Sequence, residues 1–291
     1  GSATTSASSI LSGLVLKAYI ILLIKIIYRV FTPELLQELH ISDFLLVFGI
    51  AGMIVGSVKA LKERHIKRMV AYSSVSQIGY IFMGIGLNSE IGMAAAILHL
   101  LAHAFTKPML FCSAGALVET AGHQYDMKAL KGSGLKNKLA GIGFTVGGLS
   151  MIGIPLLAGF APKLYFSEAA LGSDWFRLGV VLAALAVSTV LNALYYLPMI
   201  VNLWTPKKSQ EPSHGDAHGA SQEGHAAQEA HGEPAAELVV GEVGVMEEAH
   251  EAPRLTVSFV VSMVVFLACN VALGVAFGPI MDMIRTGLHL L

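Results

Sequence analysis

The chain has 291 residues, of which 54% are hydrophobic and 13% are charged, and its mean hydropathy is +0.65. An ordinary soluble domain carries about 25% charged residues, so the composition excludes the soluble globular classes and indicates an integral membrane protein. The formal net charge is -1, but residues 206–253 hold 10 of the 20 acidic residues and only two of the 19 basic ones. The apolar remainder of the chain is therefore basic.

Seven apolar segments are each long enough for a transmembrane helix, which needs about 20 mainly apolar residues. We therefore predict an all-α fold, a polytopic membrane helix bundle with about seven crossings. A transmembrane domain at 1–205 is followed by a linker at 206–253 and by a final transmembrane helix at 254–291. The apolar segments, in chain order, are 7–31, 41–62, 66–87, 91–118, 139–171, 174–204 and 255–288.

Two basic connections predict how these helices are oriented. Two predicted helices separate the connections, so both connections face the same side of the membrane. Cytoplasmic loops of membrane proteins carry an excess of Lys and Arg, so we expect this side, the N-terminus and the 206–253 linker to lie in the cytoplasm of a multi-pass plasma-membrane protein. The basic residues are Lys59, Lys62, Arg64, Lys67 and Arg68 in the first connection, and Lys128, Lys131, Lys136 and Lys138 in the second.

The first apolar segment contains Lys17, far from both of its ends. A lysine near a helix end can extend to the membrane surface, but Lys17 would have to reach across most of the segment. We therefore expect an internal partner for it. Lys25 and Arg29 lie nearer the outer end, where extension to water is the better interpretation.

The third apolar segment opens with Lys67 in ERHIKRMVAYSSVSQIGY. A basic cytoplasmic cluster explains this lysine about as well as a functional role does. The run of Ser73, Ser74, Ser76 and Gln77 that follows favours the functional interpretation slightly. Hydroxyl and amide groups can order water inside a bundle and so continue a polar path.

The fourth apolar segment carries three ionisable residues four positions apart, His99, His103 and Lys107. Steps of four place them within roughly 80° of one helix face, over a rise of about 12 Å. A charge near the bilayer centre costs at least about 2.5 kcal/mol on insertion scales. Three such groups in one span therefore need a structural or functional reason.

We call His99, His103 and Lys107 the polar ladder of this segment. From the residues alone, two interpretations of the ladder stay open. In the structural one, the histidines bond across helices and Lys107 pairs with a carboxylate. The acidic residues of the predicted transmembrane domain lie near span ends, however, so mid-membrane lysines outnumber mid-membrane carboxylates. Burial without a partner disfavours the charged form of a lysine, and histidine, with an unperturbed pKa of about 6.5, is a natural intermediate between lysines. This pattern favours a proton wire.

The fifth apolar segment is interrupted near its middle by Gly153-Ile-Pro155 and Gly159-Phe-Ala-Pro162, just before Lys163. Proline removes a backbone donor and clashes with the preceding turn, so we predict a broken helix. Broken helices inside membranes occur where protein buries the backbone or where it lines a wet cavity, and they mark sites in transporters. The alternative is an ordinary proline kink with Lys163 extended to the membrane surface.

The 206–253 linker is rich in Gly, Ala and Glu and is predicted to be a disordered acidic segment. Its histidines match no closed metal site, and no cysteine joins them. Metal sensing is therefore the weaker interpretation. These histidines are His214, His218, His225, His231 and His250.

The chain contains no phosphate-binding glycine loop, zinc signature, nucleophile elbow or haem motif. We therefore expect no cofactor, no metal site and no nucleic-acid partner. The residues indicate movement of ions rather than covalent chemistry. We therefore expect no catalytic centre in this chain.

Three segments, in this order, resemble one family. They are LKERHIKRMVAYSSVSQIGY, ILHLLAHAFTKPMLFCSAGAL and GIPLLAGFAPKLYFSEAAL. They are similar to the antiporter-like, proton-conducting subunits shared by complex I, Mrp-type cation/proton antiporters and membrane-bound hydrogenases. The resemblance runs from about residue 4 to about residue 205. It implies that the family fold has two inverted five-helix repeats, each with a broken helix. By this resemblance, this chain holds the second repeat, which is complete.

The resemblance also implies a proton-translocating role for six residues. They are Lys17 in the family's eighth helix, Lys67 at the start of the tenth, His99, His103 and Lys107 in the eleventh, and Lys163 at the break in the twelfth. Thr106, before Lys107, stands where many relatives carry Phe. The family's first repeat is missing, so by itself the chain is not expected to be a complete pump.

The leading hypothesis is therefore the C-terminal half of a proton-translocating subunit of an NADH:quinone oxidoreductase, a hydrogenase or an Mrp-type antiporter. Sodium/proton exchange is left open. Its expected partners are the lipid bilayer and other membrane subunits, including the missing N-terminal repeat. The alternative is a structural scaffold subunit without an ion path of its own.

Overall fold

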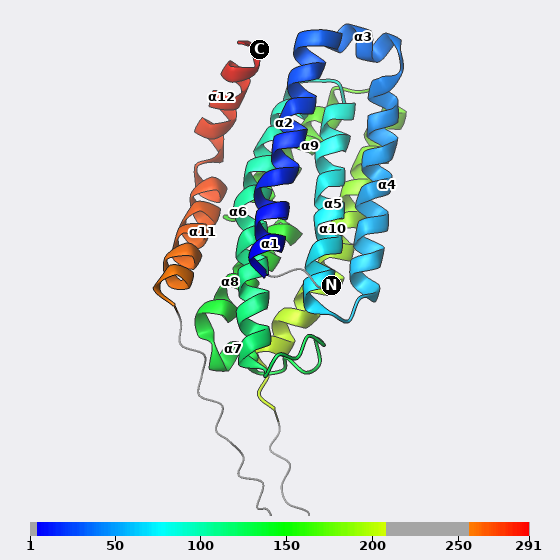
Figure 1. The fold of residues 1–291 in the computed structure, drawn as a ribbon. Helices are drawn as coiled ribbons and strands as arrows, with labels where there is room; N and C mark the ends of the chain where they lie inside the picture. Colours follow the sequence, from blue (N-terminus) through cyan, green and yellow to red (C-terminus); the bar gives the residue numbers. More distant parts are fainter. Residues whose placement is uncertain (1–4, 208–255, 291) are drawn as a thin grey trace, which may run out of the picture. The chain divides into compact units, whose positions relative to one another are not determined.

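The computed structural model describes residues 5–207 and 256–290, and within these ranges it contains helices and turns but no strand, so the all-α prediction is confirmed (Figure 1). The predicted linker at 206–253 lies outside the described residues except for its first two. The helical elements are α1 (Thr5–Ile10), η1 (Leu11–Val15), α2 (Leu16–Ile26), η2 (Ile27–Phe31), α3 (Pro33–Glu38), α4 (Ile41–Lys62), α5 (Ile66–Gly86), α6 (Glu90–Thr120), α7 (Ser133–Lys136), α8 (Lys138–Ile152), α9 (Phe160–Leu171), α10 (Trp175–Trp204), α11 (Val257–Val275) and α12 (Phe277–Leu288).

Within the described residues, five helical segments are long and apolar enough to cross a membrane: Ala7–Phe31, α4, α6, α10 and α11. Helix α5 is less apolar because it carries Lys67, Arg68 and a run of polar residues, and α8 has only 15 residues. The count of about seven crossings therefore stays a prediction.

The last apolar segment differs from the single helix expected over 255–288. Helix α11 ends at Val275, and α12 begins at Phe277 after the non-helical Ala276. Pro279 lies in the first turn of α12. Backbone N–H groups in the first turn of a helix have no helical acceptor, so the N–H that proline lacks is not needed there. The proline therefore suits the start of a new helix.

Helices α4 and α5 lie side by side with their backbones in close approach (Figure 1). A Cβ atom at Gly49 would lie 2.4 Å from the main-chain nitrogen of Met83, and one at Gly56 would lie 2.5 Å from that of Ser76. Small residues at helix interfaces permit such contacts in membranes. The close approach brings Oγ of Ser76 on α5 to 2.8 Å from Oγ of Ser57 on α4.

Helix α6 is the central element of the site. It has 31 residues, runs past Pro108 without a break, and packs against α5, α8, α9, α11 and α12. At its N-terminus, the Ser89 side chain accepts a hydrogen bond from the Gly92 N–H, which satisfies one of the donors left free at a helix start. Because α6 is surrounded on several sides, its polar ladder is enclosed by protein.

The first span reaches α6 through a π-helical segment. In η1, a Cβ atom at Gly13 would lie 2.5 Å from Cγ of Pro108, so glycine is required for this contact. A π-helical segment shifts the hydrogen-bond ladder of a helix and leaves carbonyl groups free for other partners, and such segments are frequent at functional sites. Here it ends at Val15, two positions before Lys17.

The predicted broken helix is present as α8 and α9. Helix α8 ends at Ile152, and Gly153 adopts a φ of 97°, which only glycine reaches without strain. Helix α9 begins at Phe160. The Gly159 N–H donates to Oγ of Ser150 across the break at 3.1 Å. The break therefore leaves the last carbonyl groups of α8 without helical partners.

The two basic connections contact each other, as expected for loops on the same side. His65 and Asp126 form an isolated antiparallel bridge, with the Ile66 N–H donating to the Tyr125 oxygen and the Met127 N–H donating to the Arg64 oxygen. The rings of His65 and Tyr125 stack with their centroids 4.7 Å apart. The connection before α5 is thus joined to the one after α6.

Candidate functional site

Lys17 and His103 form the closest contact between ionisable side chains in the buried core. Nζ of Lys17 lies 2.5 Å from Nδ1 of His103, and it also donates to the main-chain oxygen of Ser12 in η1. Lys17 is 5% exposed and His103 is fully buried. His103 is thus the internal partner expected for Lys17, and it joins the first span to α6.

Lys107, also fully buried, faces α5 rather than a carboxylate. Its Nζ donates to Oγ of Ser73 at 2.5 Å and to the main-chain oxygen of Val70 at 3.1 Å. Ser73 in turn lies 2.8 Å from Oη of Tyr196 on α10. Lys107 is therefore linked through the Ser73 hydroxyl on α5 to the Tyr196 hydroxyl on α10.

His99 occupies a different environment from the other members of the ladder. Its ring lies between Tyr80 and Phe166, with centroids 5.3 and 5.9 Å away. Within the described residues, neither of its ring nitrogens has a hydrogen-bond partner, and the same is true of Nε2 of His103 and of the Gln77 amide. Buried polar atoms of this kind are normally satisfied by internal water.

Lys163 turns back onto the end of α8 instead of extending away from the bundle. Its Nζ donates to the main-chain oxygens of Ile152 at 2.6 Å and of Met151 at 3.2 Å, and to Oγ1 of Thr189 at 3.3 Å. The C-terminal end of a helix carries partial negative charge. The helix break therefore provides the acceptors that hold this ammonium group, at 5.1 Å from the Tyr80 ring centroid.

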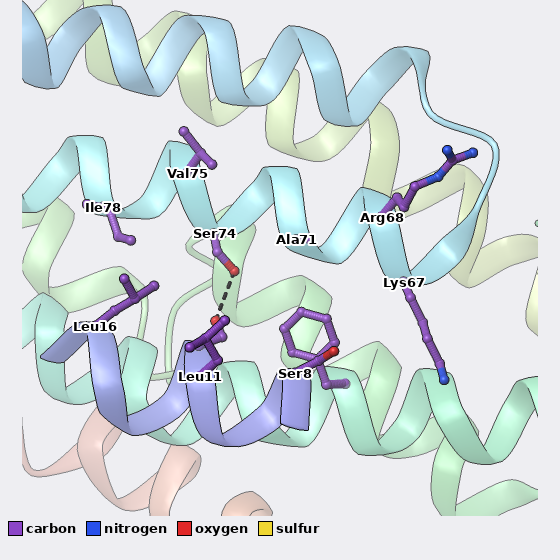
Figure 2. A pocket seen from close by; sticks show the side chains of 11 residues that line it. Ser8, Leu11, Leu16, Lys67, Arg68, Ala71, Ser74, Val75 and Ile78 are labelled. Carbon is purple, nitrogen blue, oxygen red and sulfur yellow. Dashed lines mark hydrogen bonds between the residues drawn. The ribbon is translucent and has the colours of Figure 1, made fainter. Parts of the chain in front are cut away.

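Lys67 does not lie with the other five predicted residues. It is half-buried at the start of α5, with Nζ 5.4 Å from the ring centroid of Tyr125. Figure 2 shows it at one end of a cavity of about 250 Å³ between the first span and α5, where Oγ of Ser12 and Oγ of Ser74 lie 3.1 Å apart. Leu11, Leu16 and Ile78 also line this cavity.

A polar cluster on α10 was not anticipated from the sequence. Oη of Tyr195 donates to Oδ1 of Asn192 at 2.5 Å, and Nδ2 of Asn192 donates to the Met151 oxygen at 3.4 Å. The same Asn192 Oδ1 accepts from Ser57 at 3.4 Å. The cluster connects α4, α8 and α10 within the bundle.

The α10 cluster has a sequence signal that could have identified it. Ser188, Asn192 and Tyr195 follow each other at spacings of four and three in an otherwise apolar span, which places them on one helix face. Oγ of Ser188 lies 3.5 Å from that of Ser76, which itself lies 2.8 Å from that of Ser57. The serines of α5 therefore contact α10 as well as Lys107.

The buried side chains of the described residues include lysines and histidines but no Asp or Glu. The ion pairs lie at the ends of helices, for example Arg285 with Glu90 and Arg177 with Asp43. Within residues 5–207 and 256–290, no three His, Cys, Asp or Glu residues come together as they would around a metal ion. The five histidines of the linker lie outside these ranges.

Comparisons with known proteins identify relatives of this fold. A family model described as NADH:quinone oxidoreductase/Mrp antiporter, TM, matches residues 2–191. The chain is 35% identical over 156 residues to NADH-quinone oxidoreductase subunit N 1 of Solibacter usitatus, and 29% identical over 215 residues to NAD(P)H-quinone oxidoreductase chain 4 2 of a Synechococcus strain. These alignments cover 54% and 72% of this chain, but only 32% and 39% of the relatives.

Two solved structures share the fold. The Mrp complex from Dietzia contains a chain that superposes with a TM-score of 0.74 at 24% identity, over 98% of this chain and 53% of that one. A membrane-bound sulfane sulfur reductase, an archaeal respiratory membrane complex, contains one with a TM-score of 0.73 at 22% identity, over 99% of this chain and 49% of that one. The match over residues 2–191, which confirms the resemblance in the sequence, shows that the chain belongs to the NADH:quinone oxidoreductase/Mrp antiporter transmembrane family.

Proposed function

We propose that the chain forms part of a proton-translocating, antiporter-like membrane subunit, in which Lys17, His103, His99, Lys107 and Lys163 relay protons through the bundle. The observation that carries this proposal is the buried Lys17–His103 contact in a core whose described side chains include no carboxylate. No acid fixes the charge of this lysine, and the imidazole that it contacts has a ring nitrogen that can accept a proton.

The relay requires water between its members. Residues four apart on α6 are separated by a rise of about 6 Å, which is too far for a direct hydrogen bond between His99, His103 and Lys107. The unpartnered ring nitrogens of His99, Nε2 of His103 and the Gln77 amide all lie in this region. Water held by these atoms carries the proton between relay side chains that do not contact each other.

The α10 cluster lies between Lys107 and Lys163. Lys107 contacts Ser73, which lies 2.8 Å from Oη of Tyr196, and the ring centroids of Tyr196 and Tyr195 are 4.7 Å apart. Tyr195 then bonds to Asn192, which shares the Met151 oxygen with Lys163. This series of contacts can therefore fix the two lysines in place relative to each other.

The side on which the basic connections lie is proposed to be the cytoplasm, with the bundle spanning the plasma membrane about seven times. The excess of Lys and Arg in the two paired connections supports this orientation. Lys67 is half-buried in the same region. We propose that it lies at the cytoplasmic mouth of the relay rather than within it.

The partners proposed for this chain are other membrane subunits of a respiratory or antiporter complex. The chain spans about a third of the length of the two curated relatives named above, so the first repeat of the family fold is proposed to complete the ion path. Exchange of sodium for protons is left open. The competing function is a scaffold subunit in which the buried lysines serve packing alone.

Proton flux in proteoliposomes that contain the complete complex tests this proposal. Lys107→Ala and Lys163→Ala should each abolish most of the flux, whereas Lys25→Ala, at an exposed position of α2, should leave it unchanged. Unchanged flux in both relay variants, with normal assembly, would support the scaffold function instead.

A further inference from the structure

Helix α11 presents one narrow buried face to the rest of the bundle. Its three buried residues are Met263, Asn270 and Gly274, and their spacings of seven and four place them on the same side of the helix. Asn270 is fully buried in a helix whose other residues are almost all apolar or small. A buried amide in such a helix requires partners on the neighbouring elements.

The Asn270 amide has one partner next to Lys107 and one in the helix break before Lys163. Its Nδ2 donates to Oγ1 of Thr106 at 2.7 Å, and its Oδ1 accepts from the Ala158 N–H at 3.4 Å. Thr106 is fully buried and directly precedes Lys107, while Ala158 lies in the break between α8 and α9. One side chain therefore joins the helix of Lys107 to the break that precedes Lys163.

The contact with the break is close and depends on a glycine. A Cβ atom at Gly274 would lie 2.2 Å from the main-chain oxygen of Leu156, so only glycine allows α11 to reach the break. Leu156 itself adopts a φ of 71°, a left-handed conformation that is uncommon for a leucine. An irregular backbone segment inside a membrane protein must be satisfied by surrounding groups, and α11 contributes to this.

We propose that Asn270 is a positioning residue of the relay, which fixes the helix break before Lys163 relative to the turn of α6 that carries Lys107. The inference rests on the proposed function and extends it to α11, which lies outside the 2–191 region of the family match. Asn270 acts through its two partners: it holds Thr106 on one side and the Ala158 N–H on the other. Helix α11 thus takes part in the ion path without contributing an ionisable group to it.

The test measures proton flux per assembled complex in proteoliposomes, over a range of pH, for Asn270→Ala and for the control Ser262→Ala on a less buried face of α11. Asn270→Ala should reduce the flux by about tenfold and displace its pH profile, since a misplacement of about 1 Å can cost roughly 100-fold in a reaction that depends on position. Ser262→Ala should match the wild type in both respects. A wild-type flux and pH profile in Asn270→Ala would overturn the proposal.

A second variant covers the case in which Asn270→Ala does not assemble. Thr106→Val keeps the shape of the side chain and removes only the hydroxyl that Asn270 donates to, so it should produce the same displaced pH profile. An unchanged flux and profile in Thr106→Val would contradict the proposal. Lys107→Ala, measured in parallel, distinguishes a failure of the proposed relay from a failure of the role given to Asn270. If Lys107→Ala retains full flux, the proposed relay is wrong. If Lys107→Ala loses flux while Asn270→Ala and Thr106→Val are normal, only the role of Asn270 is wrong.

Discussion

Lys163 and Asn192 share one acceptor, because the main-chain oxygen of Met151 receives a hydrogen bond from Nζ of Lys163 at 3.2 Å and from Nδ2 of Asn192 at 3.4 Å. This oxygen belongs to the last turn of α8, which the helix break leaves without its helical partner. The break therefore does more than interrupt a span. It joins a lysine from α9 and an amide from α10 at a single carbonyl group.

The first prediction concerns Asn192. Asn192→Leu keeps the approximate volume but removes the bonds to Met151 and Tyr195, so Lys163 loses a neighbour that fixes its acceptor. We expect proton flux in proteoliposomes to fall about tenfold or more while the complex still assembles. Asn202→Leu, at the end of α10 where the amide bonds to the Met127 oxygen, is the control. Equal flux in the two variants would contradict the role given to Asn192.

The second prediction concerns the hydroxyl group of Tyr196. Tyr196→Phe preserves the ring that packs against Phe144 and removes only the hydroxyl group that contacts Ser73. The free energy of unfolding should fall by about 1 kcal/mol, the typical net value of one hydrogen bond, and the flux should fall because Ser73 then holds Lys107 less firmly. Thermal unfolding and flux assays measure both changes, and a variant that alters neither would show that Ser73 does not depend on Tyr196.

The third prediction tests the packing of α4 against α5. A Cβ at Gly49 would lie 2.4 Å from backbone, whereas one at Gly52 would meet its nearest atom at an ordinary 3.5 Å. Gly49→Ala should therefore lower the free energy of unfolding by about 1 to 3 kcal/mol through overpacking, and Gly52→Ala should be neutral or slightly stabilising. Unfolding in detergent compares them, and similar midpoints for both variants would refute the close approach.

The fourth prediction concerns pH and His65, which lies in the connection between α4 and α5, outside the spans. Burial lowers the pKa of His65 from its ordinary value of 6.5, and Arg68 lowers it further, while Glu63 opposes the change. The folded state thus favours the neutral ring, so its contribution to stability is present above pH 6.5 and is lost as the pH falls below it.

The matched variant for this effect is His65→Phe, which keeps a ring to stack on Tyr125 but cannot be protonated. Its unfolding midpoint should decrease less than that of the wild type between about pH 7 and pH 5. Parallel curves for the two proteins would show that protonation of His65 does not affect the contact between the basic connections.

The sequence predicted the positions of the ionisable residues better than their partners. Gly153, Pro155 and Pro162 identified the broken helix because their backbone chemistry is local. The spacing of His99, His103 and Lys107 likewise placed them on one face. Their different environments could not be predicted, because the neighbouring spans decide them: Lys17 reaches His103, Ser73 reaches Lys107, and aromatic rings enclose His99.

Other features escaped prediction for similar reasons. The polar face of α10 is visible as a spacing pattern, but its importance depends on which helix Asn192 and Tyr195 contact. Asn270 gave no signal as a member of the site, since its two partners lie more than 100 positions away in the sequence. Lys67 was predicted as part of the path; its Nζ lies beside the Tyr125 ring of the basic connection, and its role in the path stays a prediction.

The most direct test of the relay is the proton flux of Lys17→Arg in the complete complex, reconstituted in proteoliposomes. Arginine keeps the positive charge and can still donate to His103, but it does not release its proton in proteins. We expect an assembled complex whose flux is reduced as strongly as that of Lys107→Ala. Full flux in Lys17→Arg would contradict it, because a site that serves only charge or packing tolerates arginine.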